Sequence, residues 1–103
     1  MRTVRLSKTA IVQLNALLAQ GVAPFGVRVV AEKRDLVYET IDRILAAYPA
    51  IKSPDARLRL RVYPIERTPF LVAYDFDDSE LRVYFILHRH ADLKDLDPNS
   101  VEW

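Results

Sequence analysis

The side chains best suited to chemistry gather in two short segments of the sequence. One is the run from His88 to Asp92, in which two histidines flank an arginine. The other is a set of closely spaced arginines: Arg57, Arg59, Arg61 and Arg67. Metal-free cleavage of RNA needs a base for the 2′-hydroxyl, an acid for the leaving oxygen and cations on the phosphate. If the protein is a ribonuclease, the catalytic candidates are His88, Arg89, His90 and Arg61.

The same arginines also suit a surface that binds another protein. Arginine and tyrosine are over-represented among the residues that dominate binding energy at interfaces. The residues predicted to bind a partner are Arg57, Arg59, Arg61, Tyr63, Arg67 and Arg89. A solvated strand face, or charges that protect a sheet edge from aggregation, explains the arginine row as well. The histidines fit hydrogen-bonded structural roles too, so outside the ribonuclease hypothesis no catalytic residue is assigned.

Composition limits the classes of chemistry that the chain can perform. It has no cysteine, which excludes disulfides and cysteine-ligated metals, and two histidines alone are a weak metal signal. We therefore expect no metal and no cofactor. The net charge is only +1, and because phosphate contacts dominate nucleic-acid affinity, we do not expect direct binding of nucleic acid. Neither a secretion signal nor an apolar run of about twenty residues is recognisable, which predicts a cytoplasmic protein without membrane association.

Hydrophobic periodicity predicts the first elements that would position these residues. Thr3–Leu6 alternates as an edge strand, and Ser7 is suited to cap the helix that follows. Apolar residues at helical spacing predict a first helix over Lys8–Gln20 and a second helix that ends before Pro49. The connection is predicted at Gly21–Pro24, so the two helices should form an antiparallel hairpin.

Three strands are predicted in the second half of the chain. Arg57–Tyr63 alternates strictly, so its apolar residues should pack under the helices and its arginines should face solvent. Phe70–Phe76 and Leu81–Leu87 carry apolar residues on both faces, as central strands do, and should form a β-hairpin. The fold class is therefore α+β, in the order β-α-α-β-β-β, with a helical hairpin packed on a small, mainly antiparallel sheet. Residues 1–93 are predicted to form one domain, and residues 94–103 a loose C-terminal tail in which Trp103 has no evident role.

Three local patterns resemble the RelE/ParE superfamily of bacterial toxins. The first helix carries a small residue and a leucine four apart, Ala10 and Leu14. Thr68–Tyr74 is similar to the family's strand of aromatic and aliphatic residues that ends in tyrosine. Ile86–Leu93 resembles the histidine, basic residue and Asp-Leu sequence that closes the last strand of ParE-like members. In this order the matches resemble most closely the ParE-like toxins of type II toxin–antitoxin modules.

This resemblance implies two functions of different classes. ParE-like members inhibit DNA gyrase by protein binding, and a ParD-like antitoxin with an acidic, flexible end neutralises them. RelE-like members are ribosome-dependent endonucleases that cut messenger RNA. We favour the first function, because the near-neutral charge counts against an RNA substrate and the sheet-end tyrosine or histidine-tyrosine pair of some ribonuclease members is missing. An inactive relative that only binds the antitoxin is a third alternative.

Overall fold

The centre of the fold is the β-hairpin of β3 (Phe70–Phe76) and β4 (Glu80–His88). In the computed structural model, which describes residues 1–103, this hairpin occupies the middle of a four-stranded sheet of order β1-β4-β3-β2. β1 (Thr3–Leu6) lies parallel to β4 at one edge, and β2 (Arg61–Pro64) lies antiparallel to β3 at the other. The predicted α+β class, the central hairpin and the first edge strand are confirmed, and the sheet is mixed.

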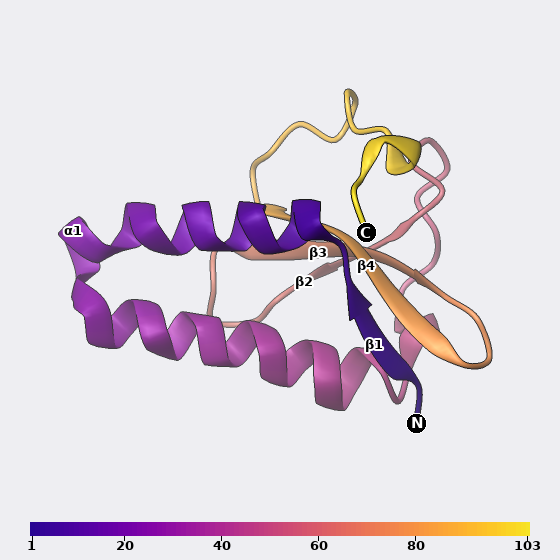
Figure 1. The fold of residues 1–103 in the computed structure, drawn as a ribbon, viewed down its shortest axis with the longest axis horizontal. Helices are drawn as coiled ribbons and strands as arrows, with labels where there is room; N and C mark the ends of the chain where they lie inside the picture. The colour runs from indigo at the N-terminus through magenta and orange to yellow at the C-terminus, as the bar shows by residue number, and fades with distance from the viewer.

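Helix α1 (Lys8–Glu39) covers one face of the sheet as two antiparallel arms (Figure 1). The arms meet at Gly26, whose φ of 85° interrupts the helix, and glycine adopts this conformation without strain because it has no Cβ. The predicted hairpin is confirmed, but its predicted connection at Gly21–Pro24 is wrong. Gly21 lies within the first arm, where an added Cβ would stand 3.2 Å from Val30 Cγ2. Gly21 therefore allows the arms to approach closely, and Gly26 makes the turn.

The two ends of α1 are fixed in different ways. At the start, Ser7 Oγ accepts a hydrogen bond from the Ala10 backbone N–H at 2.8 Å, which confirms the predicted cap. The same hydroxyl donates to the Tyr84 carbonyl at 2.7 Å and so ties the start of the helix to β4. At the other end, a π-helical turn over Thr40–Leu45 continues the second arm, and a short 3-10 turn follows at Pro49–Ile51.

Apolar cores lie on both faces of the sheet. The main core, between α1 and the sheet, consists of Ala10, Leu14, Val37, Ile41, Leu45, Ile65, Phe70, Val72, Tyr74, Leu81, Val83 and Ile86. Within it, the Tyr74 hydroxyl donates to the Pro49 carbonyl at 2.7 Å, and burial raises the pKa of this phenol. The second core, on the opposite face, consists of Leu58, Leu60, Ala73, Phe85 and Val101.

The predicted strand over Arg57–Tyr63 is wrong in its first half. The Asp55 carboxylate accepts the backbone N–H groups of Arg57 at 3.0 Å and Leu58 at 2.9 Å, and these bonds hold a turn. The strand itself begins at Arg61. Leu58 and Leu60 are buried as expected, but in the second core and not under the helices. The alternation therefore predicted which residues are buried and assigned them to the wrong face.

The C-terminal residues are packed, not loose as predicted. The Lys8 backbone N–H donates to the Glu102 carbonyl at 2.6 Å, and the Glu102 N–H donates to Thr9 Oγ1 at 3.1 Å. The Trp103 ring meets Tyr84 edge-on, with 4.9 Å between the ring centroids. In Figure 1 this segment, in yellow, returns to the start of α1. Trp103 therefore helps to close the second core.

Candidate functional site

The two arms of α1 leave an apolar groove of about 470 Å³ at the end of the sheet. Its lining residues are Leu17, Leu18, Gln20, Gly21, Phe25, Val29, Val30, Lys33, Pro69, Phe70 and His88. Phe25, beside the bend, is 67% exposed, and neighbouring Val27 is 71% exposed. Side chains of this size are rarely left in water as a group unless a ligand or partner covers them.

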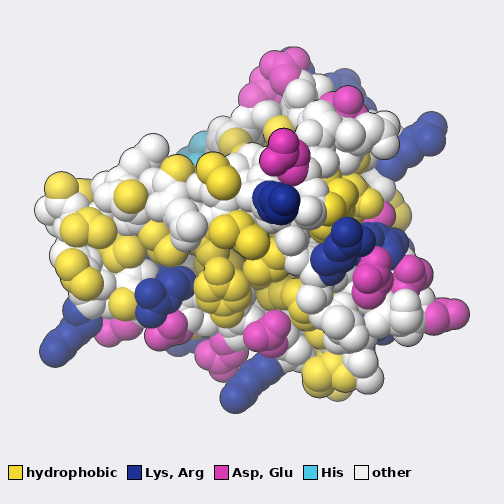
Figure 2. Space-filling view, in the orientation of Figure 1, with side chains coloured by type: hydrophobic (Ala, Val, Ile, Leu, Met, Phe, Trp, Pro, Cys, Tyr) yellow, Lys and Arg dark blue, Asp and Glu magenta, His cyan; other side chains and the backbone are white.

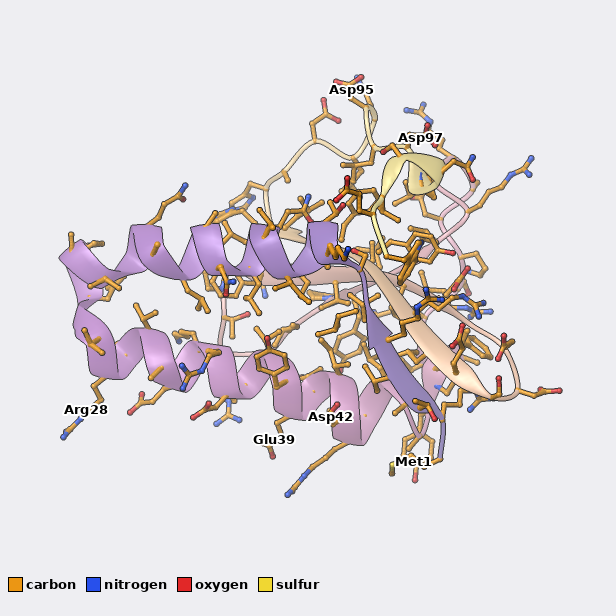
Figure 3. The ribbon with its side chains drawn as sticks, in the orientation of Figure 1. Met1, Arg28, Glu39, Asp42, Asp95 and Asp97 are labelled. Carbon is orange, nitrogen blue, oxygen red and sulfur yellow. The ribbon has the colours of Figure 1, made fainter.

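The bend end of α1 carries almost no charge. Figure 2 shows hydrophobic side chains over the bend and between the arms. Between Lys8 and Glu32 the only charged residue is Arg28, which points away from the body in Figure 3. This long uncharged stretch is the signal by which the groove could have been found in the sequence, because an exposed helix normally carries charges on its outer face.

A cationic basin of about 450 Å³ adjoins the apolar groove. The basin is lined by Lys33, Arg67, Thr68, Pro69, His88, Arg89 and His90. Lys33, Pro69 and His88 also line the groove, so the two hollows form one continuous surface. No carboxylate lines the basin, and none of its basic side chains forms an ion pair. Its positive charge is therefore available to an external anion.

The turn between β2 and β3 forms one side of the basin. Arg67 adopts a left-handed conformation with φ of 63°, and its carbonyl accepts a hydrogen bond from Lys33 Nζ. Thr68 Oγ1 donates to the Ile65 carbonyl at 2.9 Å and accepts the Phe70 N–H at 3.1 Å. The turn is thus bonded internally and to the second arm of α1, which fixes the backbone from which Arg67 projects.

The end of β4 forms the other side of the basin. The Arg89 backbone N–H donates to the Pro69 carbonyl at 2.6 Å, which ties the end of β4 to the start of β3. The His90 N–H donates to His88 Nδ1 at 3.2 Å, and the two imidazole centroids lie 5.4 Å apart. The two histidines therefore meet across the turn that follows the last residue of β4.

The structure divides the residues predicted to bind a partner. Arg67 and Arg89 lie together in the cationic basin with both histidines. Arg61 lies apart, with its guanidinium 5.0 Å from the centroid of the Phe76 ring and a hydrogen bond to the Lys52 carbonyl. Tyr63 lines a separate hollow of about 250 Å³, which also reaches Arg67. The ribonuclease set is divided in the same way, because Arg61 does not line the basin.

Arg57 and Arg59 lie in the turn before β2 and line neither the groove nor the basin. Arg57 lines a small hollow with Asp92 and Lys94. Arg59 is left-handed, with φ of 61°, and its N–H donates to the Asp55 carbonyl at 2.8 Å. The continuous arginine stripe expected from strict alternation therefore does not form, and the binding role of its members stays a prediction.

Composition also gives α1 one property of a membrane segment. By length and apolarity alone, Lys8–Leu45 could cross a membrane, with a mean hydropathy of 1.4 in its most apolar window. Only 11% of that window is buried, and the run bends back at Gly26. Several residues of this run, among them Leu17, Phe25 and Val29, line the apolar groove.

The comparisons with known proteins place the fold. No protein-family model matches the chain, and no curated protein matches it. A solved structure described as the chromosomal ParDE TA system from P. aeruginosa contains a chain that matches with a TM-score of 0.73 and 16% sequence identity. The match covers 85% of this chain and 96% of that one. At this identity the comparison establishes shape, and this chain therefore has the fold of that ParDE chain, as the resemblance to the RelE/ParE superfamily predicts.

Proposed function

We propose that this chain is a ParE-like toxin of a type II toxin–antitoxin module, which inhibits DNA gyrase by protein binding and is neutralised by a ParD-like antitoxin. The observation that supports this proposal most directly is the fold shared with a ParDE chain over 96% of that chain's length. In this proposal residues 1–93 are the toxin domain, residues 94–103 are a tail that braces it, and the protein acts in the cytoplasm.

The surface of the molecule supports binding as its mode of action. Protein interfaces combine an apolar centre with charged positions that select the partner. The apolar groove and the cationic basin provide these two parts side by side, because Lys33 and His88 belong to both. An acidic partner with an apolar stripe, as expected of an antitoxin's flexible end, complements this surface in charge and in polarity.

The RelE-like ribonuclease is the second candidate, and one observation favours it. His88, Arg89 and His90 line one basin together with Arg67, which gives two titratable rings near cations that suit a phosphate. However, displacement at phosphorus places the attacking and leaving oxygens in line, so the base and the acid must act from opposite sides. The rings of His88 and His90 pack against each other on one short turn, and Arg61 is engaged with Phe76.

The deciding experiment is induced expression of the chain in bacterial cells without an antitoxin. Cell shape, DNA-damage signalling and transcript integrity are measured in the same culture. We expect filamentous growth and DNA-damage signalling with intact transcripts. Rapid cutting of messenger RNA with arrested translation would instead establish the ribonuclease alternative, and healthy growth would indicate an inactive relative.

A double variant separates the two activities further. His88→Gln with His90→Gln removes both titratable groups but keeps hydrogen-bonding side chains in the basin. A ribonuclease should lose about two or more orders of magnitude in rate without its base and acid. For a protein that acts by binding we expect growth arrest to weaken only severalfold, since both glutamines keep hydrogen-bonding groups on the surface and an interface does not require proton transfer. A melting temperature near the wild-type value serves as the control for folding.

A further inference from the structure

The end of the α1 hairpin that carries the bend is apolar on every side. From Ala16 to Ala31, through the bend at Gly26, no residue is buried, and only Gln20 and Arg28 have polar side chains. A helix at a protein surface normally has one apolar stripe and one polar face. A helix that is apolar all round belongs in the core of a large protein or in a membrane.

The apolar groove explains only one side of this hairpin end. A second hollow of about 160 Å³ is lined by Leu18, Ala19, Val22, Val27, Val30, Ala31 and Arg34. Val22 and Val27 do not line the groove, and they are 40% and 71% exposed. A protein partner seated in the groove leaves these side chains in water. A lipid leaflet, by contrast, surrounds a tip that enters it and covers both sides at once.

The bend end projects beyond the sheet. The buried residues of α1 are Ala10, Leu14 and Val37, all well separated in sequence from the bend. Figure 1 shows the bend at one end of the molecule, whose longest dimension is 39 Å. At the rise of an α-helix, about 18 Å separate Leu14 from Gly26, which is less than the roughly 30 Å of a hydrocarbon core. The tip is therefore long enough to enter one leaflet and too short to cross the bilayer.

The backbone of the tip is compatible with lipid. In hydrocarbon every polar backbone group needs a partner within the protein, and a helix provides these partners itself. α1 is helical on both sides of Gly26. Pro24, next to the bend, has no N–H that would need a partner. The tip therefore enters an apolar phase at little cost in lost hydrogen bonds with water.

The cationic basin lies at the base of this tip. Lys33 is about 10 Å from Gly26 along the second arm, and interfacial helices enter a membrane by roughly 5–10 Å. Lys33 lines the basin together with Arg67 and Arg89, and neither arginine forms an ion pair. When the tip is inserted, the basin consequently faces the layer of lipid headgroups.

Cations outnumber carboxylates at this end of the molecule. Glu32 and Asp35 lie on the second arm, and Asp35 is already paired with Arg34 at 3.5 Å. Arg28 points away from the body in Figure 3, and its apolar stem suits a side chain that reaches back to the headgroups. The cations are Arg28, Lys33, Arg34, Arg67 and Arg89. A positive surface of this kind is attracted to anionic lipids.

We propose that the bend end of α1 is a membrane-surface anchor, which inserts its apolar tip into one leaflet of an anionic bilayer while the cationic basin contacts the headgroups. The sequence predicts no membrane association, because none of its apolar runs reaches spanning length. The folded hairpin instead gathers two shorter runs at one tip. This inference goes beyond the proposed function and does not depend on it.

The test is flotation of the purified full chain with extruded vesicles. One set contains equal amounts of phosphatidylglycerol and phosphatidylcholine, and the other contains phosphatidylcholine alone. Each basic residue close to an anionic surface strengthens binding by about fivefold. We therefore expect the chain to float with the anionic vesicles and to bind the neutral vesicles at least about tenfold more weakly.

Two serine variants test the apolar tip. Phe25→Ser should weaken binding to the anionic vesicles by about tenfold, because it removes a large apolar side chain from the inserted surface. Val12→Ser is the matched control, since Val12 is as exposed as Phe25, at 67%, and lies on the same arm outside the groove. It should bind like the wild type. Both variants should keep the wild-type melting temperature, because neither side chain is buried.

Two further variants test the basin. Arg67→Gln combined with Arg89→Gln should weaken binding to the anionic vesicles by about an order of magnitude and leave binding to the neutral vesicles unchanged. Arg57→Gln, which removes a cation outside the basin, serves as its control and should have little effect.

Three results would overturn the inference. They are no flotation with either kind of vesicle, equal binding of Phe25→Ser and the wild type, and equal binding to anionic and neutral vesicles. Sedimentation velocity without lipid provides a further check. A dimer that forms with rising concentration and is lost in Phe25→Ser would assign the tip to a second copy of the chain instead.

Discussion

Two clusters of charged side chains lie at different places on the sheet, and they are organised in opposite ways. The Arg82 guanidinium bonds Asp75 at 2.7 Å, Asp77 at 2.8 Å and Glu80 at 2.9 Å. In the cationic basin, by contrast, no basic side chain meets a carboxylate. Like charges held close together repel one another, and a nearby counter-charge offsets this repulsion. The first cluster therefore has its counter-charges within the fold, whereas the second leaves them to a ligand.

The largest expected effect comes from breaking the Arg82 cluster. Arg82→Met removes the shared partner of three carboxylates and leaves them close together, so the free energy of unfolding should fall by about 2–3 kcal/mol. Urea denaturation at neutral pH measures this change. Arg43→Met is the control, because its ion pair with Glu39 is exposed and should contribute less than about 0.5 kcal/mol. Equal losses in the two variants would contradict a structural role for the Arg82 cluster.

Replacing basic residues of the basin should lower the affinity for a partner and leave the stability nearly unchanged. Arg67→Gln combined with Arg89→Gln should change the free energy of unfolding by less than about 1 kcal/mol, since both side chains are exposed. The affinity for a ParD-like antitoxin should fall by about tenfold to a hundredfold, as measured by titration calorimetry. Arg57→Gln, at the turn before β2, is expected to alter neither quantity. A loss of affinity that merely follows a loss of stability would contradict a binding role for the two arginines.

Acid should lower the free energy of unfolding more in the wild type than in a variant without the Arg82 cluster. Hydrogen bonds from Arg82, together with those from Glu80 and Ser79, hold the pKa of Asp77 well below its usual range. Because the pKa is lower in the folded state, Asp77 contributes stability that is fully present above about pH 4 and is lost as the pH falls further. The free energy of unfolding should therefore decrease more steeply below about pH 4 in the wild type than in Arg82→Met. Parallel pH profiles would refute this linkage.

Salt should give the smallest of these effects. The screening length shortens from about 10 Å at 0.1 M to about 3 Å at 1 M ionic strength, which weakens interactions between exposed charges. Under the proposed function, the affinity for the antitoxin should therefore fall severalfold over this range, because the basin is exposed. The free energy of unfolding should change little, because the Arg82 contacts are short and direct. A binding constant insensitive to salt would argue that the groove alone carries the interaction.

The parts of the fold that depend on local pattern could be predicted from the sequence. The central hairpin follows from two apolar strands with turn residues between them, and Ser7 follows from its place before a helical pattern. The predicted bend of α1 is misplaced because Gly21 and Gly26 are equally good candidates for the turn in the sequence. Only the structure shows that Gly21 is needed for the close approach of Val30. Local sequence does not distinguish a glycine at which the chain turns from a glycine that lets two helices pack closely.

The parts that failed depend on contacts between distant segments. Alternation over Arg57–Tyr63 is also satisfied by a turn that buries Leu58 and Leu60, because the C-terminal residues provide a second core to receive them. The basin combines Lys33, Arg67 and Arg89 from three separate segments, and no spacing in the sequence links them. For the candidate site, the sequence predicted Arg67, Arg89 and the two histidines, and the fold added Lys33 and the groove, whose signal in the sequence is the nearly uncharged stretch before Glu32.

The hydrogen bonds between the start of α1 and Glu102 have a consequence for folding during synthesis on the ribosome. Thr9 and Glu102 are 93 positions apart, so this contact forms only after nearly all of the described chain has left the ribosome. Contacts of such long separation also form late, because closing a large loop costs entropy. A nascent chain therefore carries an exposed α1 and an open second core for most of its synthesis. Under the proposed function, an antitoxin would have that interval in which to bind the chain before it is completely folded.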